Sequence, residues 1–78
     1  MRKQLFDTYS LPLAVRLMGA LATRFPLVHV DHEKRHEGYR TNYAVFGRDE
    51  RADAEANLRV VDAYVTGYLD AHHSRRDA

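Results

Sequence analysis

Three histidines and two carboxylates lie close together in the stretch HVDHEKRH, which runs from His29 to His36. Imidazole and carboxylate groups bind zinc and are also the usual general acids and bases of enzymes. The first hypothesis is therefore a metal site formed by His29, Asp31 and His36. The stretch has neither the helical spacing nor the cysteine pairs of established zinc motifs, so its local structure must decide.

The local structure predicted for this stretch is a strand that runs into a turn. On a strand, His29 and Asp31 point to one face and His32 to the other, while His36 lies in the turn. At most three ligands can then meet, whereas a structural zinc site normally has four. We therefore expect no metal and no cofactor. One alternative stays open, in which a second copy of the chain supplies a further ligand such as His72 or His73.

Nucleophilic catalysis has no convincing candidate in the sequence. The chain has no cysteine, and its serines are Ser10, at a predicted helix start, and Ser74, near the end of the chain. It contains no Gly-x-Ser-x-Gly motif and no phosphate-binding glycine loop. We therefore predict that the protein is not an enzyme.

Basic side chains gather at two places and indicate an alternative function. Lys34, Arg35 and Arg40 lie at a predicted hairpin tip, and Arg48 and Arg51 lie at the other end of the second strand. Such side chains contact phosphate, so the alternative is a nucleic-acid-binding accessory protein. The net charge is only +1 and acidic residues are interleaved with the basic ones, which weakens attraction to phosphate.

Two segments have the apolar periodicity of helices. A helix over 11–25 begins after the N-cap residue Ser10 and ends at Pro26. A long helix over 49–73 begins with acidic residues, and Asp49 is its expected cap. The residues predicted to face the core are Ala14, Leu17, Met18, Leu21 and Phe25, followed by Ala54, Leu58, Val61, Val65, Tyr68, Leu69 and His72.

The chain between the helices predicts a β-hairpin with strands over 27–33 and 39–46. The turn is expected at KRHEG, and two registers fit, with either Glu33 or Asp31 opposite Arg40. In both registers the inward face is mainly apolar and the outward face mainly polar. The inward residues are Val28, Val30, His32, Tyr43 and Val45, and the outward ones are Leu27, His29, Asp31, Glu33, Arg40, Asn42, Ala44 and Phe46.

The predicted fold class is α+β, an α-β-β-α unit with two helices packed on one face of the antiparallel hairpin. Gly47 is expected to end the second strand. A two-stranded sheet is marginal alone and leaves two free edges. At about 1.5 Å per residue, a last helix of roughly 24 residues spans about 36 Å, but a strand of eight residues spans only about 26 Å. The last turns should therefore project, with an apolar stripe of Tyr64, Tyr68, Leu69 and His72 exposed.

Exposed apolar surface of this kind usually marks an interface, so we predict that dimerisation completes the unit. Small residues on the back of the same helix would allow close approach by another helix; they are Ala52, Ala56, Ala63 and Gly67. The helix propensity of alanine explains the alanines without an interface, but it does not explain Gly67.

The 78 residues are predicted to form one domain, 1–78. A chain of this size is only marginally stable, and without cysteine it has no disulfide to reinforce it, which favours assembly. No segment is apolar enough to span a membrane or resembles a signal peptide, so we expect a soluble, cytoplasmic protein. The predicted function is that of a small regulatory or adaptor protein that binds itself, as a homodimer, and another protein.

Overall fold

The computed structural model describes the backbone of residues 1–77 and the side chains of residues 1–73. The elements are β1 (Arg2–Thr8), α1 (Leu11–Arg24), β2 (His29–Glu37), β3 (Arg40–Arg48) and α2 (Ala54–Asp77). The predicted α+β class is confirmed, but the α-β-β-α order is wrong, because residues 2–8 form an additional strand. The antiparallel sheet has three strands in the order β1-β3-β2, so the hairpin is not the whole sheet.

A bulge explains why β1 shows no period-two pattern in the sequence. Gln4 pairs with Phe46 and Phe6 pairs with Val45, so Leu5 is the extra residue on β1. The bulge turns two consecutive apolar side chains, Leu5 and Phe6, into the core, where each is 8% exposed. Simple alternation would have sent one of them to solvent.

The hairpin is longer and tighter than predicted. Gly38 has a φ of 65°, which allows a two-residue turn at Gly38 and Tyr39. Glu37 is therefore opposite Arg40, and both predicted registers are wrong. The observed register differs from them by an even number of residues, so the two faces keep the membership that was predicted. The predicted turn residues KRHE belong to β2, which starts at His29 rather than at residue 27.

The predicted strand end at Gly47 is also wrong, since Gly47 lies within β3. A Cβ atom at this position would lie 3.1 Å from Leu5 Cδ1 and 3.3 Å from Leu58 Cδ2. The glycine thus permits close approach of β1 and α2 to the central strand. The predicted helix start at 49 is wrong as well, because α2 begins at Ala54.

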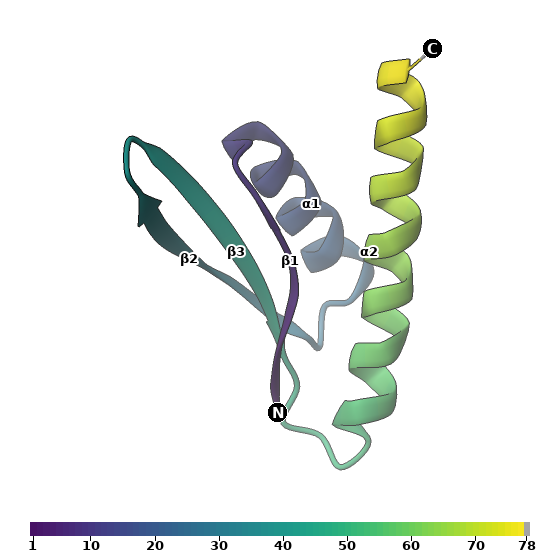
Figure 1. The fold of residues 1–78 in the computed structure, drawn as a ribbon. Coiled ribbons are helices and arrows are strands. Elements are labelled where there is room, and N and C mark those ends of the chain that lie inside the picture. Colours follow the sequence, from purple (N-terminus) through teal and green to yellow (C-terminus); the bar gives the residue numbers. More distant parts are fainter. Residues whose placement is uncertain (78) are drawn as a thin grey trace.

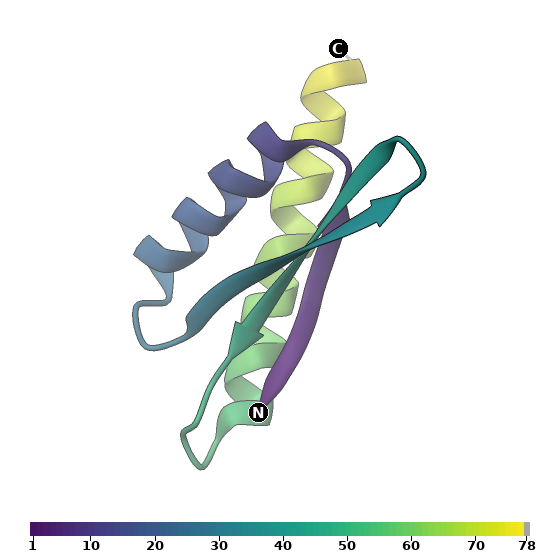
Figure 2. The same ribbon diagram turned by 90° about the vertical axis from the view of Figure 1, so that its left-hand side faces the viewer.

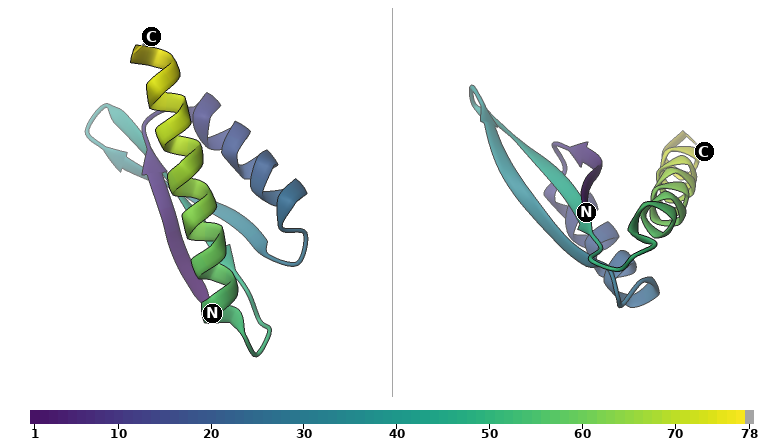
Figure 3. Two further views of the ribbon diagram at one scale, coloured as in Figure 1. Left: turned by 90° about the vertical axis from the view of Figure 1, so that its right-hand side faces the viewer. Right: turned by 90° about the horizontal axis from the view of Figure 1, so that it is seen from below.

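The molecule has two layers, with the sheet on one side and both helices on the other (Figure 1). Figure 2 looks onto the face of the sheet that carries no helix, and Figure 3 shows α2 running alongside β1. β1 and β2 are both antiparallel to β3 and hence parallel to each other, and α1 connects them. The core between the layers contains Leu5, Phe6, Ala14, Leu17, Leu21, Val28, Val45, Leu58, Val61 and Val65. Six of the twelve helix residues predicted to face the core are among these, and Met18, Phe25, Tyr68 and Leu69 pack against it.

Candidate protein-binding surfaces

The first candidate surface is the free edge of β2. This strand pairs with β3 along all nine of its residues, His29–Glu37, and has no strand on its other side within residues 1–77. An edge strand offers a row of backbone N–H and C=O groups to another chain. Charged side chains occupy most positions of β2, and such residues commonly limit non-specific pairing at sheet edges.

An apolar surface continues from this edge onto α1. A groove between the two elements is lined by Met18, Gly19, Ala22, Pro26, Leu27, Val28, His29 and Val30. Leu11 and Val15 precede Met18, Gly19 and Ala22 at helical spacing, and they are 46% and 59% exposed. We call Leu11, Val15, Met18, Gly19 and Ala22 the α1 flank. It is an apolar stripe that begins at the groove beside β2 and borders the buried face of the helix, with Met18 half-buried against the core.

The outward face of the sheet is less exposed than its polar composition suggests. Ala44 is fully buried and Phe46 is 8% exposed, because the third strand makes β3 central and long side chains cover it. The Arg2 guanidinium lies 3.7 Å from the centroid of the Phe46 ring. The same group is 3.3 Å from Asp31 and 3.0 Å from Glu33. Charged side chains of β1 and β2 therefore shield the Phe46 ring from solvent.

The residues proposed for a metal site are dispersed. His29 and Asp31 lie on the outward face, whereas His36 lies in β2, paired with Thr41, and points to the other face. At about 3.3 Å per residue, roughly 23 Å of strand separates His29 from His36. Among the side chains of residues 1–73, no three histidines or carboxylates are close enough to hold a metal ion. Absence of a structural metal stays a prediction, which chelation followed by thermal melting would test.

Four of the five basic residues proposed for phosphate contacts have partners within the described part of the protein. Arg35 is 3.9 Å from Glu33, and Arg48 is 3.5 Å from Glu50. Arg40 lies 3.7 Å above the ring of Tyr9. Arg40 lies beside the hairpin turn, as predicted, but Lys34 and Arg35 lie within β2, paired with Tyr43 and Asn42. Arg48 ends β3 at the other end of the hairpin, and Arg51 lies in the loop that follows.

The apolar stripe predicted on the last helix packs largely within the molecule. Tyr64, Tyr68 and Leu69 are half-buried against the core. The rings of Tyr64 and Phe25 meet edge to face at 5.5 Å. His72 is half-buried and its ring is 5.9 Å from that of His73. The last turns of α2 do project beyond α1, as Figures 1 and 3 show.

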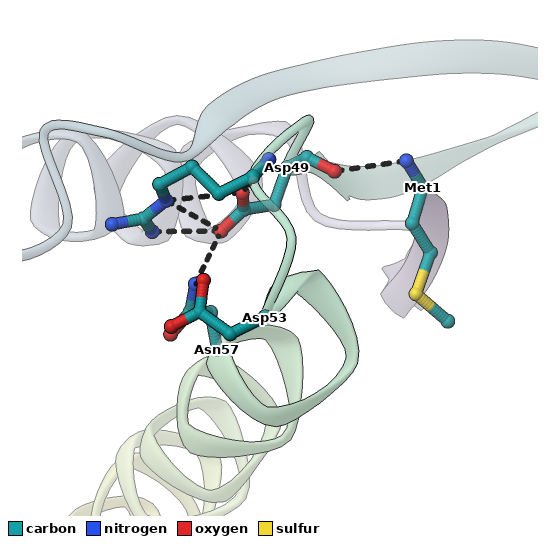
Figure 4. A network of polar contacts seen from close by, with 5 residues as sticks. Met1, Asp49, Asp53 and Asn57 are labelled. Carbon is teal, nitrogen blue, oxygen red and sulfur yellow. Dashed lines mark hydrogen bonds and ion pairs between the residues drawn. The ribbon is translucent and has the colours of Figure 1, made fainter.

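Asp49 has a structural role that the sequence did not indicate. It is 1% exposed, and its carboxylate accepts hydrogen bonds from the Arg51 guanidinium at 2.7 Å, the Arg51 backbone N–H at 2.8 Å and Asn57 at 3.1 Å. Its backbone exchanges two hydrogen bonds with Met1, which extends the contact between β1 and β3 (Figure 4). The bonds from Arg51 hold the pKa of Asp49 far below its usual range. The sequence predicts Asp49 as a helix cap, but α2 begins at Ala54, and only the fold reveals this buried cluster.

Comparisons with protein-family models, curated proteins and solved structures find no match. None of the helices within residues 1–77 has the length and apolar character needed to cross a membrane.

Proposed function

We propose that this is a small non-enzymatic protein that acts as a regulator or adaptor through protein–protein contacts, and that it works as a homodimer. The free edge of β2 is the observation that carries the proposal. Strand addition at such an edge is a common mode of protein recognition, because backbone hydrogen bonds extend the sheet. Adding a second copy would join two three-stranded sheets into one.

The α1 flank supports the same partner. In an antiparallel pair of β2 strands, the two-fold axis is perpendicular to the sheet, so both copies present their helices on the same side. The two flanks then face each other across the axis. Leu11 and Val15, which are about half exposed in one copy, would become buried, and burial of apolar surface favours association.

The charges of β2 favour one register. If Glu33 lies opposite Glu33 of the second copy, Asp31 lies opposite Arg35 and His29 lies opposite Glu37, each pair twice. The two Asp31–Arg35 pairs bring opposite charges together and contribute about 0.2–1 kcal/mol each, against one like-charged Glu33–Glu33 pair on the axis. Moving the second strand by two residues in either direction sets Asp31 opposite Glu33 or Glu37, where like charges repel.

The alternative of nucleic-acid binding gains no specific support. Four of the five basic residues proposed for it pair with acidic or aromatic groups of the same chain; they are Arg35, Arg40, Arg48 and Arg51. Release of those contacts would offset part of the attraction to phosphate.

Sedimentation of a matched pair of variants tests the homodimer. Val15 on the α1 flank and Val60 on α2 are 59% and 60% exposed, so aspartate at either position leaves the fold of one copy intact. We expect the wild type and Val60→Asp to sediment as dimers at tens of micromolar concentration. Val15→Asp should sediment as a monomer, because the carboxylate would be buried in the contact without a partner. A monomeric wild type, or a Val15→Asp variant of wild-type mass, would contradict the proposal.

A further inference from the structure

A pocket of about 260 Å³ lies on the α2 side of the loop that connects α1 to β2. Its walls come from the end of α1, from that loop, from the loop before α2 and from the first half of α2; the residues are Arg24, Phe25, Pro26, Leu27, Val28, Arg51, Asn57 and Val60. Sites for drug-sized ligands are usually about 300–1,000 Å³. A pocket slightly smaller than these fits a single end group of a chain better than an extended segment.

Two arginines line this pocket, and one of them is paired with a carboxylate. Arg24 and Arg51 contribute to the walls and no acidic residue does. Two carboxylates of the loop before α2 contact lining residues. Asp49 is buried and bound by Arg51 and Asn57, and Asp53 accepts a hydrogen bond from Asn57 at 3.0 Å. The Arg51 bonds to Asp49 use Nε and Nη2, so Nη1 keeps its donors for another acceptor. Asp49 therefore orients the Arg51 guanidinium and balances its charge, so Arg51 offers directed donors while Arg24 supplies the positive charge.

The remaining walls are mainly apolar and unusually open to water. Leu27 is 71% exposed and Val60 is 60% exposed, and both line the pocket. Covering such side chains with an apolar ligand group is favourable by about 25 cal/mol per Å² of apolar surface removed from water. A ligand that matches both features carries an anion directly beside an apolar group.

We propose that this pocket binds the C-terminal residue of a partner protein when that residue is apolar. The terminal carboxylate would accept hydrogen bonds from Arg24 and Arg51, and the side chain would lie against Leu27 and Val60. Arginine forms the strong, directional, charge-assisted bonds that carboxylates prefer. The pocket contains no residue of β2 and shares only Pro26, Leu27 and Val28 with the groove on the other side of the loop. It can therefore act whether or not the protein dimerises through β2.

Titration of the isotope-labelled protein, followed by backbone amide chemical shifts, tests this site. N-acetylleucine should shift the amides of residues 24, 25, 27, 28, 57 and 60, and its neutral analogue N-acetylleucinamide should bind at least about tenfold more weakly. A peptide of six residues ending in leucine should bind at least as well as N-acetylleucine, since its chain continues into solvent.

Variants separate the pocket from a general effect of charge. Arg24→Gln should weaken N-acetylleucine about tenfold, whereas Arg16→Gln on the same helix should not change binding. Val60→Glu places a carboxylate at an exposed wall position and should abolish binding with no loss of folding. Three results would each overturn the site: no shifts with N-acetylleucine, equal binding of acid and amide, or equal weakening by both arginine variants. Exclusion of the peptide would overturn the assignment of a partner's C-terminus.

Discussion

At the scale of single residues, Asp49 shows how one buried carboxylate can organise three segments. Its side chain holds the loop before α2 through Arg51 and holds the first turn of α2 through Asn57. Its backbone pairs with Met1 beside β1. A buried charge is stable only when it is paired and hydrogen-bonded, and Asp49 meets both conditions.

Acid should therefore destabilise the fold, and Asp49 should account for part of the effect. The folded-state pKa of Asp49 is lowered, mainly by hydrogen bonds from Arg51. The ionised carboxylate stabilises the folded state above the unfolded-chain value of about 3.9, and this stabilisation is lost as the pH falls below it. We expect Asp49→Asn to lower the melting temperature by about 5–10 °C at neutral pH and to reduce its acid dependence. Asp70→Asn, at an exposed position, serves as the control, and equal pH profiles for Asp49→Asn and wild type would refute the assignment.

At the scale of elements, the sequence predicted both helices, the hairpin and its two faces, because these depend on apolar period and on parity. It could not predict β1, since the bulge at Leu5 removes the alternation by which a strand is recognised. It could not predict the register, since Glu33, Asp31 and Glu37 all offer Arg40 an opposite charge. The candidate site residues show the same limit. The face of the sheet on which a residue lies could be predicted from the sequence, but the acidic and aromatic side chains that contact the arginines could not.

Gly47 sets the distance between the sheet and α2, so a larger residue there should be costly. We expect Gly47→Val to lower stability by about 1–3 kcal/mol, because its methyl groups would overlap with Leu5 and Leu58. Thermal melting measures the change. Gly67→Ala is the contrasting variant, since a Cβ at Gly67 meets nothing within 4 Å, and it should raise stability by up to about 1 kcal/mol.

The same pair of variants tests the predicted stripe of small residues. If Gly67 lay in a helix contact between copies, Gly67→Ala would weaken assembly in sedimentation. If Gly47→Val leaves the melting temperature unchanged, α2 can move away from the sheet without loss of stability, and the role assigned to Gly47 is wrong.

At the scale of the whole molecule, the proposed dimer joins two incomplete sheets at their more exposed edges. The outward face of the joined sheet would carry a row of alternating charges across the two-fold axis. The two Glu33 carboxylates would meet near the axis, and an arginine in each copy, Arg2, lies 3.0 Å from Glu33 to neutralise it.

Charge reversal should therefore convert a homodimer into a heterodimer. Asp31→Arg alone sets arginine opposite Arg35, and Arg35→Asp alone sets aspartate opposite Asp31. Each variant alone should therefore dimerise at least about tenfold more weakly than the wild type. A mixture of the two restores opposite charges at both pairs and should dimerise like the wild type. Sedimentation of the separate and mixed variants measures this, with melting curves to confirm that both are folded. A mixture that dissociates as readily as its components would exclude the proposed register.

The position of β1 in the sheet also sets the order in which the chain can fold. β2 and β3 are joined by a two-residue turn and can pair as soon as both have been synthesised. β1 cannot pair fully until Arg48, the partner of Arg2, has been synthesised. Pairing across so long a stretch of chain is slow compared with local hairpin formation. During synthesis, Leu5 and Phe6 therefore stay exposed until almost the whole sheet-forming sequence has left the ribosome. The strand that completes the core is the one that a nascent chain would carry unprotected for longest.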